Sequence, residues 1–178
     1  MLLDEVAEVG IATESLADYQ DLVTLPCYEW QHVLVMPLNH PLAKKERINL
    51  EDLAAEAIIT YHPSFTGRTR VDGAFAQRKL SPRIVLEAID SDVIKTYVRL
   101  GLGIGIVAEM AVRDDGTNAD LAVRPLGALF GQNVARVAFK RGAYLRNFVF
   151  RFAELLSDRL DRNLIAKAMT GHASDYDL

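Results

Sequence analysis

Residues 90–108 read Asp-Ser-Asp-Val-Ile-Lys-Thr-Tyr-Val-Arg-Leu-Gly-Leu-Gly-Ile-Gly-Ile-Val-Ala, and this stretch decides the fold class. Ser91 is predicted to cap a helix, because its hydroxyl can accept from a free backbone N–H. The charge of Asp92 then lies in the first turn, where the helix dipole favours it. Apolar residues follow at helical spacing: Val93, Ile94, Tyr97 and Val98. Gly101 is predicted to end the helix, and Leu102–Val107 to form a buried strand that another backbone approaches closely.

The rest of the chain alternates predicted strands with predicted helices. Strands are expected at 9–13, 22–25, 33–37, 58–61, 84–88, 121–126 and 134–139. Helices are expected after the cap Asn49, from the loop at 62–68 to about Arg78, and over 145–156 and 164–169. This alternation is typical of an α/β fold with a mostly parallel sheet, whose ligands lie at strand carboxyl ends beside helix N-termini. Two polar stretches, 114–118 and 171–178, are predicted to be flexible.

Composition excludes several classes of protein. The 178 residues carry 20 basic and 24 acidic side chains, for a net charge of −4, which argues against nucleic-acid binding by this chain itself. The single Cys27 excludes an internal disulfide and fits a reducing compartment. The chain has no apolar run of about 18 residues and no basic signal-peptide region at its start. We therefore expect a cytoplasmic protein without a membrane span.

The sharpest local signal of a binding site is Ser64-Phe65-Thr66-Gly67-Arg68, between a predicted strand and a predicted helix. Thr66 can cap the helix, Gly67 lets a ligand approach the backbone, and Arg68 adds positive charge. Free N–H groups, a hydroxyl and a guanidinium together suit a small oxyanion. The alternative is an ordinary capped helix with solvated arginines, and the local pattern by itself favours that alternative.

Other candidate residues are weaker. Thr13 ends a buried strand and can aim its hydroxyl into the same site, although a threonine bonded to its own backbone is more frequent. Trp30 is suited to the wall of a pocket, and a core or interface role is equally open. The glycines at 101–105 fit close packing better than a dinucleotide loop, because such a loop follows a strand and opens a helix.

Catalytic and metal-binding patterns are weak. The four histidines lack the spacing of a metal site: His32, His40, His62 and His172. There is no Gly-x-Ser-x-Gly motif, and Cys27 has no neighbouring base in the sequence. We therefore expect no catalytic residues, no metal and no cofactor.

Several segments together resemble a known family. They are Gly10-Ile-Ala-Thr-Glu14, Leu25-Pro-Cys-Tyr28 with Trp30, His40-Pro-Leu42, Phe65-Thr-Gly-Arg68 and residues 90–105. They resemble the effector-binding domain of LysR-type transcriptional regulators, in the branch that contains CysB and Cbl and controls sulfur assimilation. The resemblance runs from about residue 2 to about residue 160. The later segment at 135–152 is closer to Cbl.

The resemblance implies an α/β fold of two lobes of the periplasmic-binding-protein type, joined by crossing strands. Lobe I would comprise residues 1–28 and 132–178, and lobe II residues 29–131. The chain would be truncated at its N-terminus, since the family's helix-turn-helix and the first strand and helix of lobe I have no counterpart here. Promoter DNA would then be contacted only through that missing domain.

The resemblance also implies a ligand between the lobes, sulfate or a sulfur metabolite such as adenosine 5′-phosphosulfate. The implied and locally predicted site residues are Thr13, Trp30, Ser64, Phe65, Thr66, Gly67 and Arg68. The family forms homodimers or homotetramers, so self-association is expected. Two alternatives remain: a solute-binding protein for a small anion, which requires a signal peptide or lipid anchor, and an enzyme of the same fold, which requires an acid–base pair in the cleft.

Overall fold

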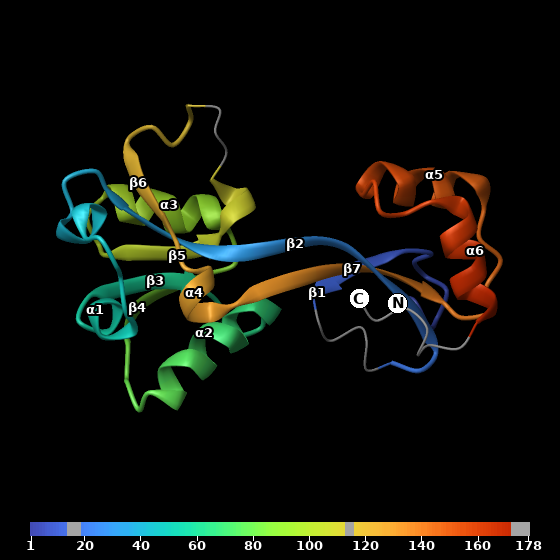
Figure 1. Cartoon of the computed structure of the whole chain (residues 1–178), viewed down its shortest axis with the longest axis horizontal. Helices are drawn as coiled ribbons and strands as arrows, with labels where there is room; N and C mark the ends of the chain where they lie inside the picture. The colour runs from blue at the N-terminus through green and yellow to red at the C-terminus, as the bar shows by residue number, and fades with distance from the viewer. Residues whose placement is uncertain (14–18, 113–115, 172–178) are drawn as a thin grey trace. The chain divides into compact units, whose positions relative to one another are not determined.

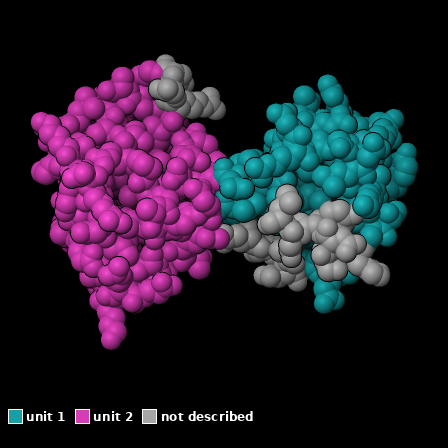
Figure 2. All heavy atoms as spheres, viewed as in Figure 1, with its two compact units in different colours: residues 1–29, 133–178 teal, residues 30–132 magenta. Residues whose placement is uncertain are grey.

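The computed structural model describes residues 1–13, 19–112 and 116–171 (Figure 1). The predicted flexible stretches at 114–118 and 171–178 therefore lie partly outside the described residues. The chain divides into two compact units, unit 1 with residues 1–29 and 133–178, and unit 2 with residues 30–132 (Figure 2). Each unit contains its own hydrophobic core.

Unit 2 is built on a mixed sheet. Its strands are the second half of β2 (Leu22–Pro37), β3 (Ala57–Tyr61), β4 (Arg83–Ala88), β5 (Ile104–Ala108) and β6 (Leu121–Pro125). β3 pairs in parallel with β4 and β5, whereas β2 pairs antiparallel with β5 and β6. The predicted mostly parallel sheet is thus wrong outside β4-β3-β5. Within these three strands, the crossover connections that parallel pairing requires are the helix between β3 and β4 and the helix between β4 and β5.

β2 also corrects the predicted pair of strands at 22–25 and 33–37, since it runs through both without a break. Its first half contributes Leu25 and Cys27 to the core of unit 1, and its second half contributes Leu34 and Met36 to the core of unit 2. The two apolar runs predicted as separate strands are therefore the two halves of one strand, and each half packs into a different core.

Helices cover both faces of the unit 2 sheet. α1 (Leu50–Ala54), α2 (Thr66–Gln77) and α4 (Gly127–Phe130) share a core with Leu34 and Met36 of β2. α3 (Ser91–Arg99) packs on Val33 and Val35 of β2, which alternate along the strand with Leu34 and Met36. Because successive strand residues point to opposite faces, α2 and α3 lie on opposite sides of the sheet. Two short 3-10 turns, η2 (Pro41–Lys44) and η3 (Glu109–Ala111), complete the unit.

The stretch at 90–108 forms a helix and a strand as predicted, with one change at its start. The N-cap is Asp90 and not Ser91: an Asp90 carboxylate oxygen accepts from the Asp92 N–H at 2.6 Å. At the other end, Gly101 adopts a φ of +79°, a conformation that favours glycine, and the helix stops there as predicted.

The predicted apolar face of α3 is half correct. Ile94 and Val98 are fully buried, but Val93 and Tyr97 are 41% and 39% exposed. The predicted close approach of another backbone is confirmed at Gly103, just before β5, where an added Cβ would clash with the Ala57 carbonyl. At Gly105 the close neighbours are side chains, with a Val35 methyl group 2.6 Å from an added Cβ.

Unit 1 consists of β1 (Gly10–Thr13), the first half of β2, β7 (Gln132–Lys140), α5 (Asn147–Leu156) and α6 (Arg162–Thr170). β1 pairs antiparallel with β7, and Thr13 lies opposite Ala135. The core of this unit joins Val137 and Phe139 of β7 to the buried faces of α5 and α6. The predicted helices at 145–156 and 164–169 are thereby confirmed.

Candidate functional site

The turn between β3 and α2 is closed by its own hydrogen bonds. The Phe65 N–H donates to the His62 carbonyl at 3.0 Å, and the Ser64 N–H donates to His62 Nδ1 at 3.2 Å. The Phe65 ring is stacked on the Tyr61 ring, with 5.6 Å between centroids. The predicted loop residues Ser64 and Phe65 therefore lie in a defined turn that leads directly into α2.

The start of α2 has neither a side-chain cap nor an acidic residue. Phe65 occupies the N-cap position and makes no capping hydrogen bond, and the first turn holds no carboxylate. The prediction that Thr66 caps the helix is wrong, since Thr66 is already the first helical residue; its side chain lies outside the described residues. The first N–H groups of a helix have no intrahelical acceptors, and the helix dipole makes this end positive. This end of α2 is therefore suited to an anion.

Gly67 brings the first turn of α2 against two aromatic side chains of β2. A Cβ added at Gly67 would lie 2.8 Å from Trp30 Cη2 and 3.0 Å from His32 Nε2. Trp30 is 8% exposed, and its ring meets the His32 ring edge-on, 5.0 Å between centroids. Two predicted site residues far apart in the chain, Trp30 and Gly67, are thus brought together within unit 2.

His32 is a residue of this neighbourhood that the sequence did not single out for binding. It is 1% exposed, and neither ring nitrogen has a hydrogen-bond partner among the described residues. Burial, and then the charge of Arg70, lower the pKa of His32 to about 4, so the ring is neutral near pH 7. The sequence signal that was available is its position two residues after Trp30 on the same face of one strand.

Arg68 has a different place from the one predicted. Arg68 is 6% exposed, and its guanidinium donates to the Tyr61 carbonyl at 2.7 Å. It also forms ion pairs with Asp72 at 2.7 Å and with Glu87 at 2.8 Å. With two carboxylates already beside it, this guanidinium connects α2 to β3 and β4, and its contact with an anion stays a prediction.

Unit 1 holds Thr13 and a second residue that the sequence did not indicate. Thr13 ends β1, is 8% exposed and lies opposite Ala135 in β7. Asn133 lies two residues before Ala135, on the same face of β7. Asn133 is fully buried, and neither its amide nitrogen nor its oxygen has a partner among the described residues. Unit 1 therefore presents a hydroxyl and a buried amide on one face.

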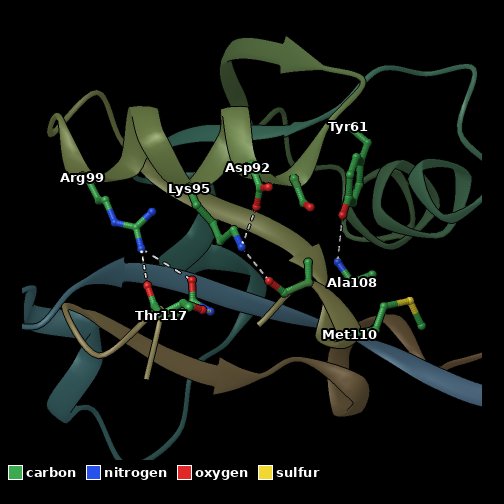
Figure 3. A pocket seen from close by; sticks show the side chains of 10 residues that line it. Tyr61, Asp92, Lys95, Arg99, Ala108, Met110 and Thr117 are labelled. Atoms are coloured by element: carbon green, nitrogen blue, oxygen red, sulfur yellow. Dashed lines mark hydrogen bonds and ion pairs between the residues drawn. The ribbon is translucent and has the colours of Figure 1, made fainter. Parts of the chain in front are cut away.

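A cavity of about 660 Å³ opens on the other face of the unit 2 sheet, beside α3 (Figure 3). Its charged side chains are paired. The Lys95 ammonium donates to the Ala111 carbonyl at 2.7 Å and contacts Asp92 at 2.8 Å. Arg99 is bound by Asp120 at 2.6 Å. The cavity contains none of the predicted site residues, so the start of α2 is the better candidate for an anion site.

Metal and membrane signals are missing from the described part of the chain. Residues 1–13, 19–112 and 116–171 hold no group of three metal-ligating side chains. Every helix within those ranges is too short or too polar to cross a bilayer.

Comparison with known proteins agrees with the resemblance stated above. The family described as LysR substrate binding domain matches residues 1–161. CysB of Burkholderia cenocepacia is 51% identical over the whole chain, which covers 56% of that protein. SsuR of the same organism is 45% identical over 93% of the chain and 54% of its own length. The chain thus spans about half the length of these relatives, which are named as transcriptional regulators.

The fold is shared with solved structures. The crystal structure of the cofactor-binding domain of the Cbl regulator has a TM-score of 0.85 and 41% sequence identity to this chain. The match covers 96% of this chain and 75% of that one. The two-lobe α/β fold class is thereby confirmed, and relatives of this kind are regulators and not enzymes. This chain belongs to the family of LysR substrate-binding domains.

Proposed function

We propose that this chain senses a small oxyanion for a regulator of sulfur assimilation, with sulfate or adenosine 5′-phosphosulfate as effector. The observation that carries the proposal is the start of α2, which is uncapped and free of carboxylates, with Trp30 and Gly67 in contact beside it. Backbone N–H groups at such an end bind tetrahedral anions without needing a full positive charge. The relatives named CysB and SsuR support the regulatory class.

Unit 1 holds further candidate ligand groups of its own. Thr13 supplies a hydroxyl and Asn133 a buried amide, on one face of β1 and β7. In the proposal, Thr66, Trp30 and the α2 N–H groups of unit 2 bind the anion, and Thr13 of unit 1 is a further candidate ligand. Ser64 and Phe65 shape the turn that leads into this helix.

In the proposal, signalling depends on a difference in the affinity of the effector for two arrangements of the lobes. A ligand biases the equilibrium between two lobe arrangements only by the difference in its affinity for them. In the proposal, the shift passes through a dimer or tetramer to promoter DNA, which a helix-turn-helix domain binds in the cytoplasm.

The proposal is tested at Thr66. Replacing Thr66 by Val removes a hydroxyl and keeps the shape, so the affinity for sulfate should fall by about 5- to 30-fold, corresponding to about 1–2 kcal/mol. Isothermal titration calorimetry with sodium sulfate measures this change.

Thr69→Val is the matched control, because Thr69 lies in the same helix and is exposed. It should leave sulfate affinity unchanged. Equal affinities of wild type and Thr66→Val would remove Thr66 from the site, and failure of the wild type to bind sulfate or adenosine 5′-phosphosulfate would overturn the proposed effector class.

A further inference from the structure

His32 is buried without a visible reason. It lies in the middle of β2 between two aromatic rings, Trp30 at 5.0 Å and Phe130 at 5.8 Å between centroids, both edge-on. A neutral imidazole has one N–H donor and one acceptor nitrogen, and an apolar side chain of similar size would fill the same space without unmet hydrogen bonds. Both nitrogens lack partners among the described residues, which points to a partner that is not part of the protein.

The position of Nε2 indicates where that partner is. Nε2 lies 3.0 Å from the point that a Cβ on Gly67 would occupy. Because Cα–Cβ bonds in a helix tilt toward its N-terminus, this point is on the N-terminal side of the first turn of α2. The backbone N–H groups at the start of a helix point toward the same end, and of these the Arg68 N–H donates to the Phe65 carbonyl at 3.0 Å. The ring and the helix end are therefore directed to one small region.

We propose that His32 binds the effector, with Nε2–H donating a hydrogen bond to an oxygen of the oxyanion held at the start of α2. This inference rests on the function proposed above and adds a residue to its site. It also names the ligand group: a tetrahedral oxyanion, which offers acceptors on every side and can meet the helix N–H groups and the imidazole at once.

The charges around His32 give the site a pH dependence. The charged group known to act on the ring is Arg70 of α2, and the rings of Trp30 and Phe130 on the other sides are neutral. Without ligand, burial and then Arg70 lower the pKa of His32 to about 4. A bound anion favours the protonated ring and raises this pKa. Binding then takes up a proton, and affinity rises as the pH falls.

Calorimetry with sodium sulfate tests the inference, because sulfate remains a dianion at the pH values used. From about pH 7.5 to about pH 5.5, the wild-type affinity should rise by about 3- to 10-fold. His32→Gln keeps an N–H donor near the place of Nε2, so it should still bind sulfate but without this rise. His32→Phe removes the donor and should weaken binding by about 10-fold or more at both pH values.

His40→Gln is the matched control, since His40 lies at the N-cap of η2, where its Nδ1 accepts from the Leu42 N–H at 3.3 Å. It should keep the rise in affinity at low pH. Thermal unfolding separates binding from folding: His32→Phe removes two unmet polar atoms and should unfold at the same or a higher temperature than wild type. In the nitrogen NMR spectrum, the ring signals of His32 should shift when sulfate is added.

The experiment distinguishes a failure of the His32 inference from a failure of the proposed function. If the wild type binds sulfate but His32→Phe binds it equally well with the same pH profile, His32 is not a ligand and the proposed function stands. If neither binds sulfate, the proposed function itself fails. A well-folded His32→Phe with weakened binding, together with a pH-independent His32→Gln, would establish the role of His32.

Discussion

At the scale of single residues, the candidate site depends on what lies next to Gly67. The same helix offers a glycine in a different environment, Gly73, where an added Cβ would meet no atom within 4 Å. At Gly67 the Cβ would be 2.8 Å from the ring of Trp30, which is 8% exposed and cannot move far. A substitution at Gly73 therefore reports only the helix propensity of glycine, whereas a substitution at Gly67 also reports the steric contact with Trp30 and His32.

Gly67→Ala should lower the free energy of unfolding by about 1–2 kcal/mol, because crowding of Trp30 and His32 outweighs the gain in helix propensity. It should also weaken sulfate binding. Gly73→Ala should raise the free energy of unfolding by about 0.5–1 kcal/mol, since only the propensity changes. Urea unfolding checks both, and a stabilised Gly67→Ala would contradict the close contact described here.

At the scale of elements, α1, α2 and α3 differ in whether a side chain accepts a hydrogen bond from the backbone N–H groups of the first turn. α1 begins with a full capping box between Asn49 and Asp52, and α3 begins with Asp90 accepting from the Asp92 N–H. α2 begins without either device. Capping stabilises a helix start, so its omission at α2 leaves N–H groups available to a ligand.

The cap of α3 can be tested directly. Asp90→Ala should lower the free energy of unfolding by about 1 kcal/mol, because the Asp92 N–H loses its acceptor. Asp90→Asn should change it by only a few tenths of a kcal/mol, since the amide oxygen caps as well as the carboxylate. Thermal unfolding monitored by circular dichroism measures both, and equal losses for the two variants would assign the effect to charge instead of capping.

At the scale of the whole molecule, the chain passes from unit 1 to unit 2 in β2 and returns in β7. Along α3, Val93 and Tyr97 are 41% and 39% exposed, and the C-cap Leu100 that follows is 73% exposed. Exposed apolar residues grouped on one helix are typical of interaction surfaces. This supports the expectation that the chain self-associates, with α3 contributing to the contact.

Light scattering should show a dimer or larger species at high protein concentration. Leu100→Lys should shift the chain toward monomer, because it places a charge within the apolar group. Leu38→Lys is the control, since Leu38 is 57% exposed in the turn after β2 and lies outside α3. A strict monomer at every concentration, or equal effects of the two variants, would contradict a contact through α3.

The sequence by itself determined the α/β class, the positions of most helices and strands, and the closely packed glycine strand, predicted at 102–107 and found at 104–108. These follow from periodicity and caps, which depend on residues a few positions apart. Only the tertiary structure decided that Arg68 is used by Glu87, 19 residues away, and that His32 lies buried beneath Gly67. The reason is that the pairing of a polar group depends on elements distant in the chain, and no local pattern contains that information.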